Sequence, residues 1–309
     1  MMNLDIADID CIYLSYDEPE KEEFWIKLRN MIPWIKRVDG VKGSDAAHKA
    51  CAEESNTERF IVIDGDNMPM PEFFNLTFKF ENKEQEQAVY RWRARNNING
   101  LMYGNGGLSS WTKKFVMNMR THESSDGDKK TEVEFCFDPL YWAMHDCYST
   151  TYPNQSQFQA WRAGFREGVK MCLVQGKKPS IDEFKDLVHK QNMNNLTIWH
   201  NIGRDVENGI WAMVGAREGT HLTMLSNIKR STVDWDYTQV RSFDWLENYW
   251  NDKSEQEKLN PEETYIKLSR GLRRLDLPYL NYNAEHSAFF KHHYLSNWTN
   301  RGLMVREID

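Results

Sequence analysis

The chain has 309 residues and a mass of 36.6 kDa, enough for one large domain or for a core domain with an appendage. Its hydrophobic share of 40% and aromatic share of 13% exclude a disordered chain. The net charge of −7 is uneven, because residues 1–90 contain 19 acidic and 10 basic residues. That acidic part is a poor surface for a polyanion, whereas the rest of the chain could carry a basic face.

No apolar run reaches the roughly 18 residues that span a bilayer. Residues 1–10 are acidic, unlike the basic and then apolar start of a signal peptide. The sequence therefore predicts a cytoplasmic protein without a membrane span.

The first 65 residues alternate between short β-rich segments and helical patterns. Strands are predicted over 9–15, 34–38 and 59–64, with helices over 21–32 and 44–55. This alternation favours an α/β fold with a doubly wound parallel sheet, whose ligand site lies beyond the carboxyl ends of the strands.

Later segments are less regular. A boundary near residue 230 is predicted between an α/β core, residues 1–230, and a helical C-terminal region, residues 231–309. Further strands are predicted over 73–80, 98–107 and 133–137, and further helices over 85–96, 155–174, 180–191, 243–251, 261–275 and 285–298.

The most informative segment is residues 60–67, FIVIDGDN. A buried apolar strand there delivers two carboxylates, Asp64 and Asp66, separated by a glycine that leaves room. Two such oxygen ligands can share one divalent cation whose other positions take diphosphate oxygens and water. A solvated turn is the alternative, and it is less favoured directly after the third strand of a nucleotide-type α/β unit.

Other phosphate-binding classes lack their residues in this chain. There is no P-loop and no Gly-x-Gly-x-x-Gly after the first strand, which argues against a P-loop nucleotidase and a dinucleotide oxidoreductase. The first strand ends in Leu14-Ser15 without a nucleophilic aspartate, which disfavours a phosphatase with an aspartyl intermediate.

Several segments together resemble a known family, the GT-A-fold glycosyltransferases of bacteriophages that sugar-modify hydroxymethylated pyrimidines in their own DNA. The nearest group is the 5-hydroxymethylcytosine arabinosyltransferases. The resemblance covers about residues 9–220 and is carried by residues 13–19 (YLSYDEP), 36–41 (KRVDGV), 47–49 (AHK), 60–67 (FIVIDGDN), 103–107 (YGNGG) and 160–167 (AWRAGFRE).

The resemblance implies a GT-A-like, Rossmann-type mixed sheet with a helical C-terminal extension. It also implies a UDP-sugar donor and Mn²⁺ or Mg²⁺ held by Asp66 and Asp64. GT-A enzymes often add a histidine ligand from late in the core, for which we select His200 ahead of His221. A packed histidine is the alternative at His200.

Three other features add to the expected donor site. The glycines of residues 103–107 let the backbone approach a ligand, unless they form only a tight turn. Arg162 and Arg166 share a helical face suited to donor diphosphate or DNA backbone, unless they are merely ion-paired. Lys49 could equally be a surface lysine. The predicted donor-binding set is Ser15, Tyr16, Asp17, Glu18, Arg37, Asp39, Lys49, Asp64, Gly65, Tyr103, Gly106, Gly107, Arg162 and Arg166.

Transfer to a hydroxymethyl group by an inverting route requires a carboxylate as general base. Asp138 is the best-placed candidate, ahead of Glu134 and Asp146, although it could instead be a helix N-cap. In a retaining route the departing phosphate takes the proton, and the sequence does not choose between the two.

The expected acceptor is double-stranded DNA containing 5-hydroxymethylcytosine, in the cytoplasm of a phage host. A stacked base must be reached through a groove or by extrusion. Two alternatives remain: a GT-A transferase acting on a cell-surface glycan or small molecule, and a non-catalytic nucleotide-sugar or DNA-binding module. The basic residues expected to contact DNA are Lys229, Arg230, Arg270, Arg273 and Arg274.

Overall fold

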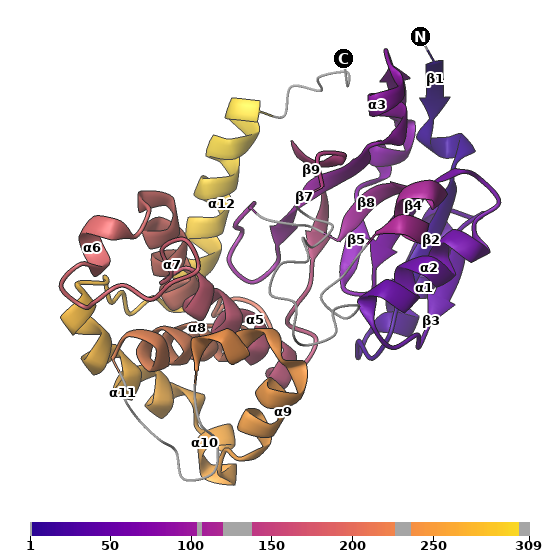
Figure 1. Ribbon diagram of the computed structural model, residues 1–309. Coiled ribbons are helices and arrows are strands. Elements are labelled where there is room, and N and C mark those ends of the chain that lie inside the picture. The colour runs from indigo at the N-terminus through magenta and orange to yellow at the C-terminus, as the bar shows by residue number, and fades with distance from the viewer. Residues whose placement is uncertain (1, 104–106, 120–137, 226–235, 303–309) are drawn as a thin grey trace. The chain divides into compact units, whose positions relative to one another are not determined.

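The computed structural model describes residues 2–103, 107–119, 138–225 and 236–302, with side chains described up to residue 294. The chain divides into two compact units (Figure 1). The sheet unit comprises residues 1–96, 102–152 and 297–309, and the helical unit comprises residues 97–101 and 153–296. This division differs from the predicted boundary near residue 230, because residues 153–225 pack with the later helices.

The sheet unit is built on a seven-stranded mixed sheet with the order β3-β2-β4-β8-β7-β9-β5. The α/β class is therefore confirmed. Strands β2, β3 and β4 are parallel, while β8 runs antiparallel to both β4 and β7. The strands are β2 (Asp10–Ser15), β3 (Lys36–Asp39), β4 (Arg59–Asp64), β5 (Asn67–Pro69), β7 (Val89–Asn96), β8 (Leu108–Thr112) and β9 (Tyr141–Thr151).

Helices α1 and α2 connect the parallel strands. Phe24 and Leu28 of α1 and Cys51 of α2 are buried in the sheet-unit core. A separate two-stranded ribbon pairs β1 (Met2–Asp5) with β6 (Thr77–Phe80). The helices are α1 (Lys21–Met31), α2 (Ser44–Glu54), α3 (Lys83–Gln87) and α4 (Lys113–Asn118), with short 3-10 turns at Ile6–Asp8 and Pro71–Asn75.

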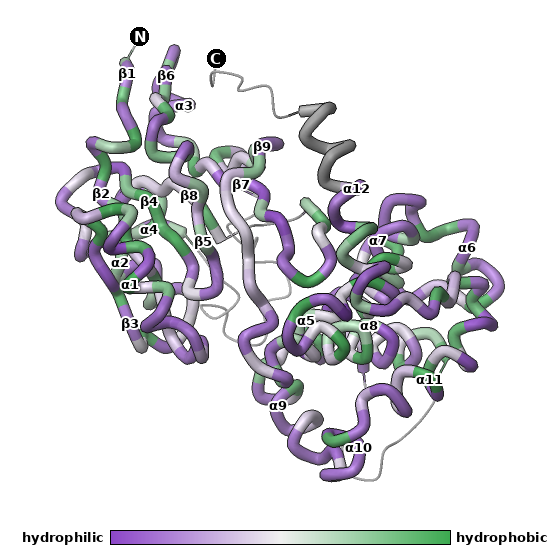
Figure 2. The backbone as a smooth tube through the Cα atoms, turned by 180° about the vertical axis from the view of Figure 1, so that it is seen from behind, coloured by the Kyte–Doolittle hydropathy of each residue, from purple (hydrophilic) through white to green (hydrophobic). Residues whose placement is uncertain are grey.

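Strand β4 lies inside the sheet, with β2 on one side and β8 on the other. Phe60, Ile61, Val62 and Ile63 are fully buried, which matches the hydrophobic colouring of β4 in Figure 2. A continuous apolar run of this kind is typical of a strand covered on both faces. The strand ends at Asp64, so the polar turn begins where the buried core ends.

Several predicted elements are wrong in type or extent. The strand predicted over 73–80 begins only at Thr77, because Pro71–Asn75 forms a 3-10 helix. Residues 89–96 form strand β7 within the predicted 85–96 helix, because Val89, Tyr90, Trp92 and Ala94 are buried and alternate with arginines. Of the strand predicted over 98–107, the described residues form one bridge at Met102, and β8 begins at Leu108. Within 180–191, only 184–187 and 190–191 are helical. The predicted 133–137 strand lies outside the described residues.

The helical unit centres on helix α8 (Gly209–Met224), nearly all of which is buried. Among the described helices, none is long and apolar enough to cross a membrane. The other elements are α5 (Gln157–Lys170), α6 (Phe184–Leu187), α7 (Lys190–Asn201), η5 (Tyr237–Arg241), α9 (Phe243–Asn251), α10 (Glu255–Leu259), α11 (Pro261–Leu272), η6 (Arg273–Leu275) and α12 (Ala284–Gly302).

Helices α5 and α8 touch backbone to backbone. A β-carbon at Gly164 or Gly168 of α5 would overlap a carbonyl oxygen of α8, and one at Gly215 or Gly219 of α8 would overlap a carbonyl oxygen of α5. Each helix carries its two glycines four residues apart, hence on one face. The absence of side chains there allows the two helices to approach this closely.

Gly164→Ala should therefore lower the free energy of unfolding by about 3 kcal/mol, since the new methyl group has no space. This cost reverses the stabilisation that alanine usually gives over glycine inside a helix. Ala163→Ser on the same helix is the control and should cost about 0.5 kcal/mol. Urea unfolding followed by circular dichroism measures both, and a Gly164→Ala protein as stable as the wild type would contradict this packing.

Candidate active site at the carboxyl edge of the parallel strands

The parallel register brings the polar ends of three strands together. Ser15 pairs with Asp39 between β2 and β3, and Leu14 pairs with Asp64 between β2 and β4. Because parallel strands end at the same edge, all these residues lie at one edge of the sheet. The predicted convergence of the polar segments after the first three strands is confirmed.

Asp39 is the centre of a hydrogen-bonded cluster at this edge. Its carboxylate accepts from Ser15 Oγ at 2.7 Å and from Lys21 Nζ at 2.8 and 3.0 Å. Burial would raise the pKa of Asp39, but these bonds and the charge of Arg37 hold it below its usual value. Asp39 is thus a carboxylate at neutral pH.

Arg37 is held by two kinds of contact. Its guanidinium donates two bonds to the Glu22 carboxylate, at 2.8 and 2.6 Å, and it lies 5.7 Å from the Tyr13 ring and 5.6 Å from the Trp25 ring. The bidentate bond raises the pKa of Arg37. The sequence gives no signal that Lys21, Glu22 and Trp25 lie at this edge, because they are on α1 and not at the end of a strand.

The segment after β2 turns its residues in different directions. The Tyr16 side chain is 43% exposed, and Asp17 is exposed too. Glu18 instead folds back to accept the Tyr16 backbone N–H at 2.7 Å. Its carboxyl group lies so close to Gly65 that a β-carbon there would overlap it. Glu18 therefore approaches the Asp64-Gly65-Asp66 turn.

The turn itself is held by backbone contacts. Tyr13 donates its hydroxyl to the Gly65 carbonyl at 2.9 Å, and the Asp66 carbonyl accepts the Tyr152 N–H at 2.7 Å. Burial raises the pKa of Tyr13, and the charges of Glu18 and Asp66 raise it further against the opposing effect of Arg37. The Tyr13 hydroxyl consequently stays a proton donor at neutral pH.

Asp64 lies against the loop that precedes β8. Its N–H donates to the Gly107 carbonyl at 2.8 Å, and a β-carbon at Gly107 would lie 2.9 Å from Asp64 Oδ2. Gly107 has a φ of +66°, a value that glycine adopts without strain. Burial raises the pKa of Asp64 to about 6, with Arg91 opposing the rise and Glu18 adding to it.

These residues suit a divalent cation in donor chemistry. Asp64 and Asp66 offer the carboxylate oxygens that Mg²⁺ and Mn²⁺ prefer, and Gly107 lies against the Asp64 carboxyl group. A buried carboxylate with a raised pKa is also one that a nearby cation would stabilise. The described residues contain no group of three or more His, Cys, Asp or Glu side chains that could hold a metal.

Lys49 forms an ion pair with Asp45 on α2, at 2.6 Å, as the surface-lysine alternative expected. Tyr103 and Gly107 are described, whereas Gly106 lies outside the described residues.

Asp138 is exposed and accepts the Leu140 N–H at 2.8 Å, so it caps a turn before β9.

We expected His200 to be a metal ligand, but the structure gives it a different environment. Its side chain is 1% exposed inside the helical unit, and Nε2 lies 3.0 Å from Thr220 Oγ1 and 3.3 Å from the Ala216 carbonyl. Burial and the nearby Arg217 lower its pKa to about 3. His200 is therefore a neutral, hydrogen-bonded core residue.

Arg162 and Arg166 belong to the helical unit, where both lie against Phe243. Their guanidinium carbons are 4.9 and 5.1 Å from its ring centre.

Among the residues expected to contact DNA, Arg270, Arg273 and Arg274 are exposed at the end of α11 and in η6. Lys229 and Arg230 lie outside the described residues.

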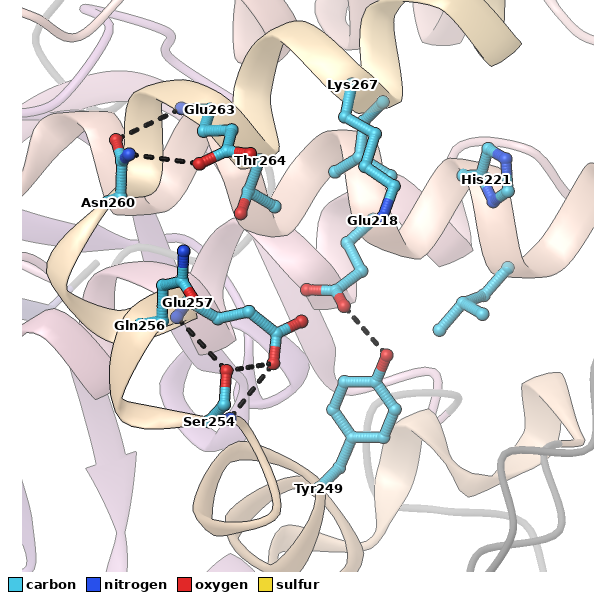
Figure 3. Close-up of a pocket in the computed structure, with 12 residues that line it drawn as sticks. Glu218, His221, Tyr249, Ser254, Gln256, Glu257, Asn260, Glu263, Thr264 and Lys267 are labelled. Carbon is cyan, nitrogen blue, oxygen red and sulfur yellow. Dashed lines mark hydrogen bonds between the residues drawn. The ribbon is translucent and has the colours of Figure 1, made fainter.

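A cavity of about 370 Å³ opens in the helical unit beside α8 and α11 (Figure 3). Glu218 points to its floor, where it accepts from Tyr249 Oη at 2.7 Å. Lys253 donates to both Glu218 oxygens at 2.8 and 2.7 Å, and Trp161 Nε1 donates at 2.9 Å. The buried carboxylate is fully satisfied, which indicates a structural role.

Comparison with known proteins gives no assignment. No protein-family model matches the chain, and no curated protein matches it. Among solved structures, HddC from Yersinia pseudotuberculosis matches 46% of this chain and 71% of its own, with 16% identity and a TM-score of 0.27. A likeness this low carries no conclusion about fold or function.

The raised pKa of Asp64 determines how this residue's contribution to the free energy of unfolding changes with pH. Between pH 4 and pH 6 the folded protein holds a proton on Asp64 that the unfolded chain releases, so this residue's contribution to stability falls as pH rises. Asp64→Asn removes this dependence. Relative to the wild type, the variant should therefore gain about 2 kcal/mol in unfolding free energy between pH 4.5 and pH 7.5.

Urea unfolding at the two pH values measures this difference. Asp39→Asn is the matched control and should shift equally at both, because the pKa of Asp39 is lowered and the group is ionised throughout. The same pH-independent shift for Asp64→Asn would contradict the buried state of Asp64.

Proposed function

We propose that the protein is a metal-dependent glycosyltransferase with a GT-A-like fold. It moves a sugar, with arabinose as the leading candidate, from a UDP-sugar to 5-hydroxymethylcytosine in DNA. The proposal rests on the Asp64-Gly65-Asp66 turn at the carboxyl end of β4, beside the polar ends of β2 and β3. The mixed sheet order is compatible with a GT-A-like arrangement.

Asp64 and Asp66 would hold Mn²⁺ or Mg²⁺. When bound, such an ion supplies positive charge that stabilises the negative charge on a departing diphosphate. The lack of a side chain at Gly107 supports this role, because that position lies against the Asp64 carboxyl group that the cation must reach.

The cluster around Asp39 would bind the nucleoside. Ser15, Lys21 and Arg37 fix the Asp39 carboxylate, which is ionised and partly open to solvent and can accept hydrogen bonds from a base or a ribose. The exposed Tyr16 ring lies two residues from Glu18 and offers a face for stacking. Binding at this edge leaves the sugar-phosphate part near the aspartates.

In the reaction, the acceptor hydroxyl attacks the anomeric carbon as the bond from that carbon to the phosphate oxygen breaks. UDP leaves, and the hydroxyl proton passes to a base. In an inverting reaction Asp138 is our candidate for that base, because it is exposed and one of its oxygens accepts a single backbone bond. In a retaining reaction the leaving phosphate takes the proton.

The test is incubation with a panel of UDP-sugars and Mn²⁺ or Mg²⁺, using duplex DNA with 5-hydroxymethylcytosine and matched unmodified DNA. Mass spectrometry of the digested nucleosides should show one added glycosyl group on 5-hydroxymethylcytosine alone. Product on neither DNA with any donor would contradict the proposed acceptor. UDP release without DNA would then indicate a different acceptor.

Asp66→Ala should lower the rate of transfer about 100-fold or more, because a cation ligand is worth several kcal/mol in the transition state. Asp8→Ala removes an exposed carboxylate elsewhere in the sheet unit and should keep the wild-type rate. Circular dichroism checks that both variants fold. An Asp66→Ala protein as active as the wild type would overturn the metal role.

A further inference from the structure

One face of α5 carries a row of cations. Arg162, Arg166 and Lys170 follow one another at intervals of four residues, so they lie on one helical face at steps of about 6 Å. Arg241 at the end of η5 adds a fourth charge. These four residues, together with Phe243, are called the cationic stripe below.

Contacts within the stripe keep it in place. Phe243, the first residue of α9, is 50% exposed and lies against both arginines. Desolvation and the charges of Arg166 and Arg241 lower the pKa of Lys170, while Glu167 raises it. The positive charges are therefore close enough to repel one another.

Two carboxylates of the described residues lie beside the stripe. Glu167 lies 3.4 Å from Lys170, and Asp244 is exposed next to Phe243 on α9. Among the described residues, the buried Nε of Arg166 has no hydrogen-bond partner. Such a donor is costly to leave unmatched, and an anion arriving at the stripe would offset part of that cost electrostatically.

We propose that the cationic stripe binds a single-stranded stretch of nucleic acid, with phosphates along α5 and a base stacked on Phe243. Three cations over about 12 Å of helix match a repeating anion better than one isolated phosphate. An exposed ring beside guanidinium groups is a stacking platform that any base can use.

This inference deepens the acceptor part of the proposed function, since a base extruded from a duplex leaves an unpaired nucleotide to be held. Binding itself needs neither donor nor metal. A test of binding alone therefore separates failure of this inference from failure of the proposed reaction.

The experiment measures fluorescence anisotropy of a labelled 20-nucleotide thymidine strand with full-length protein in EDTA, without donor. Lys170→Glu combined with Arg241→Glu should raise Kd about tenfold or more and lower the slope of log Kd against log salt by about 1.4. Lys185→Glu combined with Lys190→Glu changes the net charge equally at exposed positions of the helical unit and should alter Kd less than twofold.

A third variant tests the stacking. Phe243→Ala should raise Kd at least about fivefold while leaving the salt slope unchanged, because it removes an uncharged contact. Circular dichroism melts confirm that each variant folds. Equal weakening by both charge-reversal pairs, no effect of Phe243→Ala, or binding to phosphatidylserine vesicles but not to the strand would each overturn the inference.

Discussion

The parallel pairing of β2 with β3 and β4 is the constraint on which the candidate site depends. Its register ends the three strands together, so Ser15, Asp39 and Asp64 meet at one edge although up to 49 positions separate them in the sequence. The apolar residues of β4 make this arrangement stable, because the strand is buried on both faces and a shift in register would expose part of its apolar run.

The same burial gives the two acidic clusters different properties. Asp39 is ionised and held by Lys21, Ser15 and Arg37, as suits a group that binds a neutral partner by hydrogen bonds. Asp64 lies in a poorly solvated position with a raised pKa, as suits a group that gains from a cation. One sheet edge thus carries an ionised, hydrogen-bonded carboxylate and a carboxylate with a raised pKa.

The pattern of apolar residues in the sequence predicted some of the helices and strands correctly. Strand β4 and helix α9 begin and end where the sequence indicated, since β4 is a continuous apolar run and the apolar residues of α9 follow helical spacing. The sequence of β7 resembles a polar helix because arginines lie between its buried aromatic residues. Helix α8 shows no amphipathic pattern because nearly every side of it is buried. The ends of the predicted strands indicated the candidate site. Lys21 and Glu22 belong to it as well, but they reach it from helix α1. His200 is buried within the helical unit by packing that no local sequence pattern shows.

The most direct test of this account is anomalous diffraction at the manganese edge from crystals grown with Mn²⁺ and UDP. We expect one strong peak within coordination distance of Asp66 and Asp64 carboxylate oxygens, about 2.2 Å, and uridine next to Asp39. Well-ordered UDP bound away from the edge formed by β2, β3 and β4, with no manganese at the Asp64-Gly65-Asp66 turn, would contradict it.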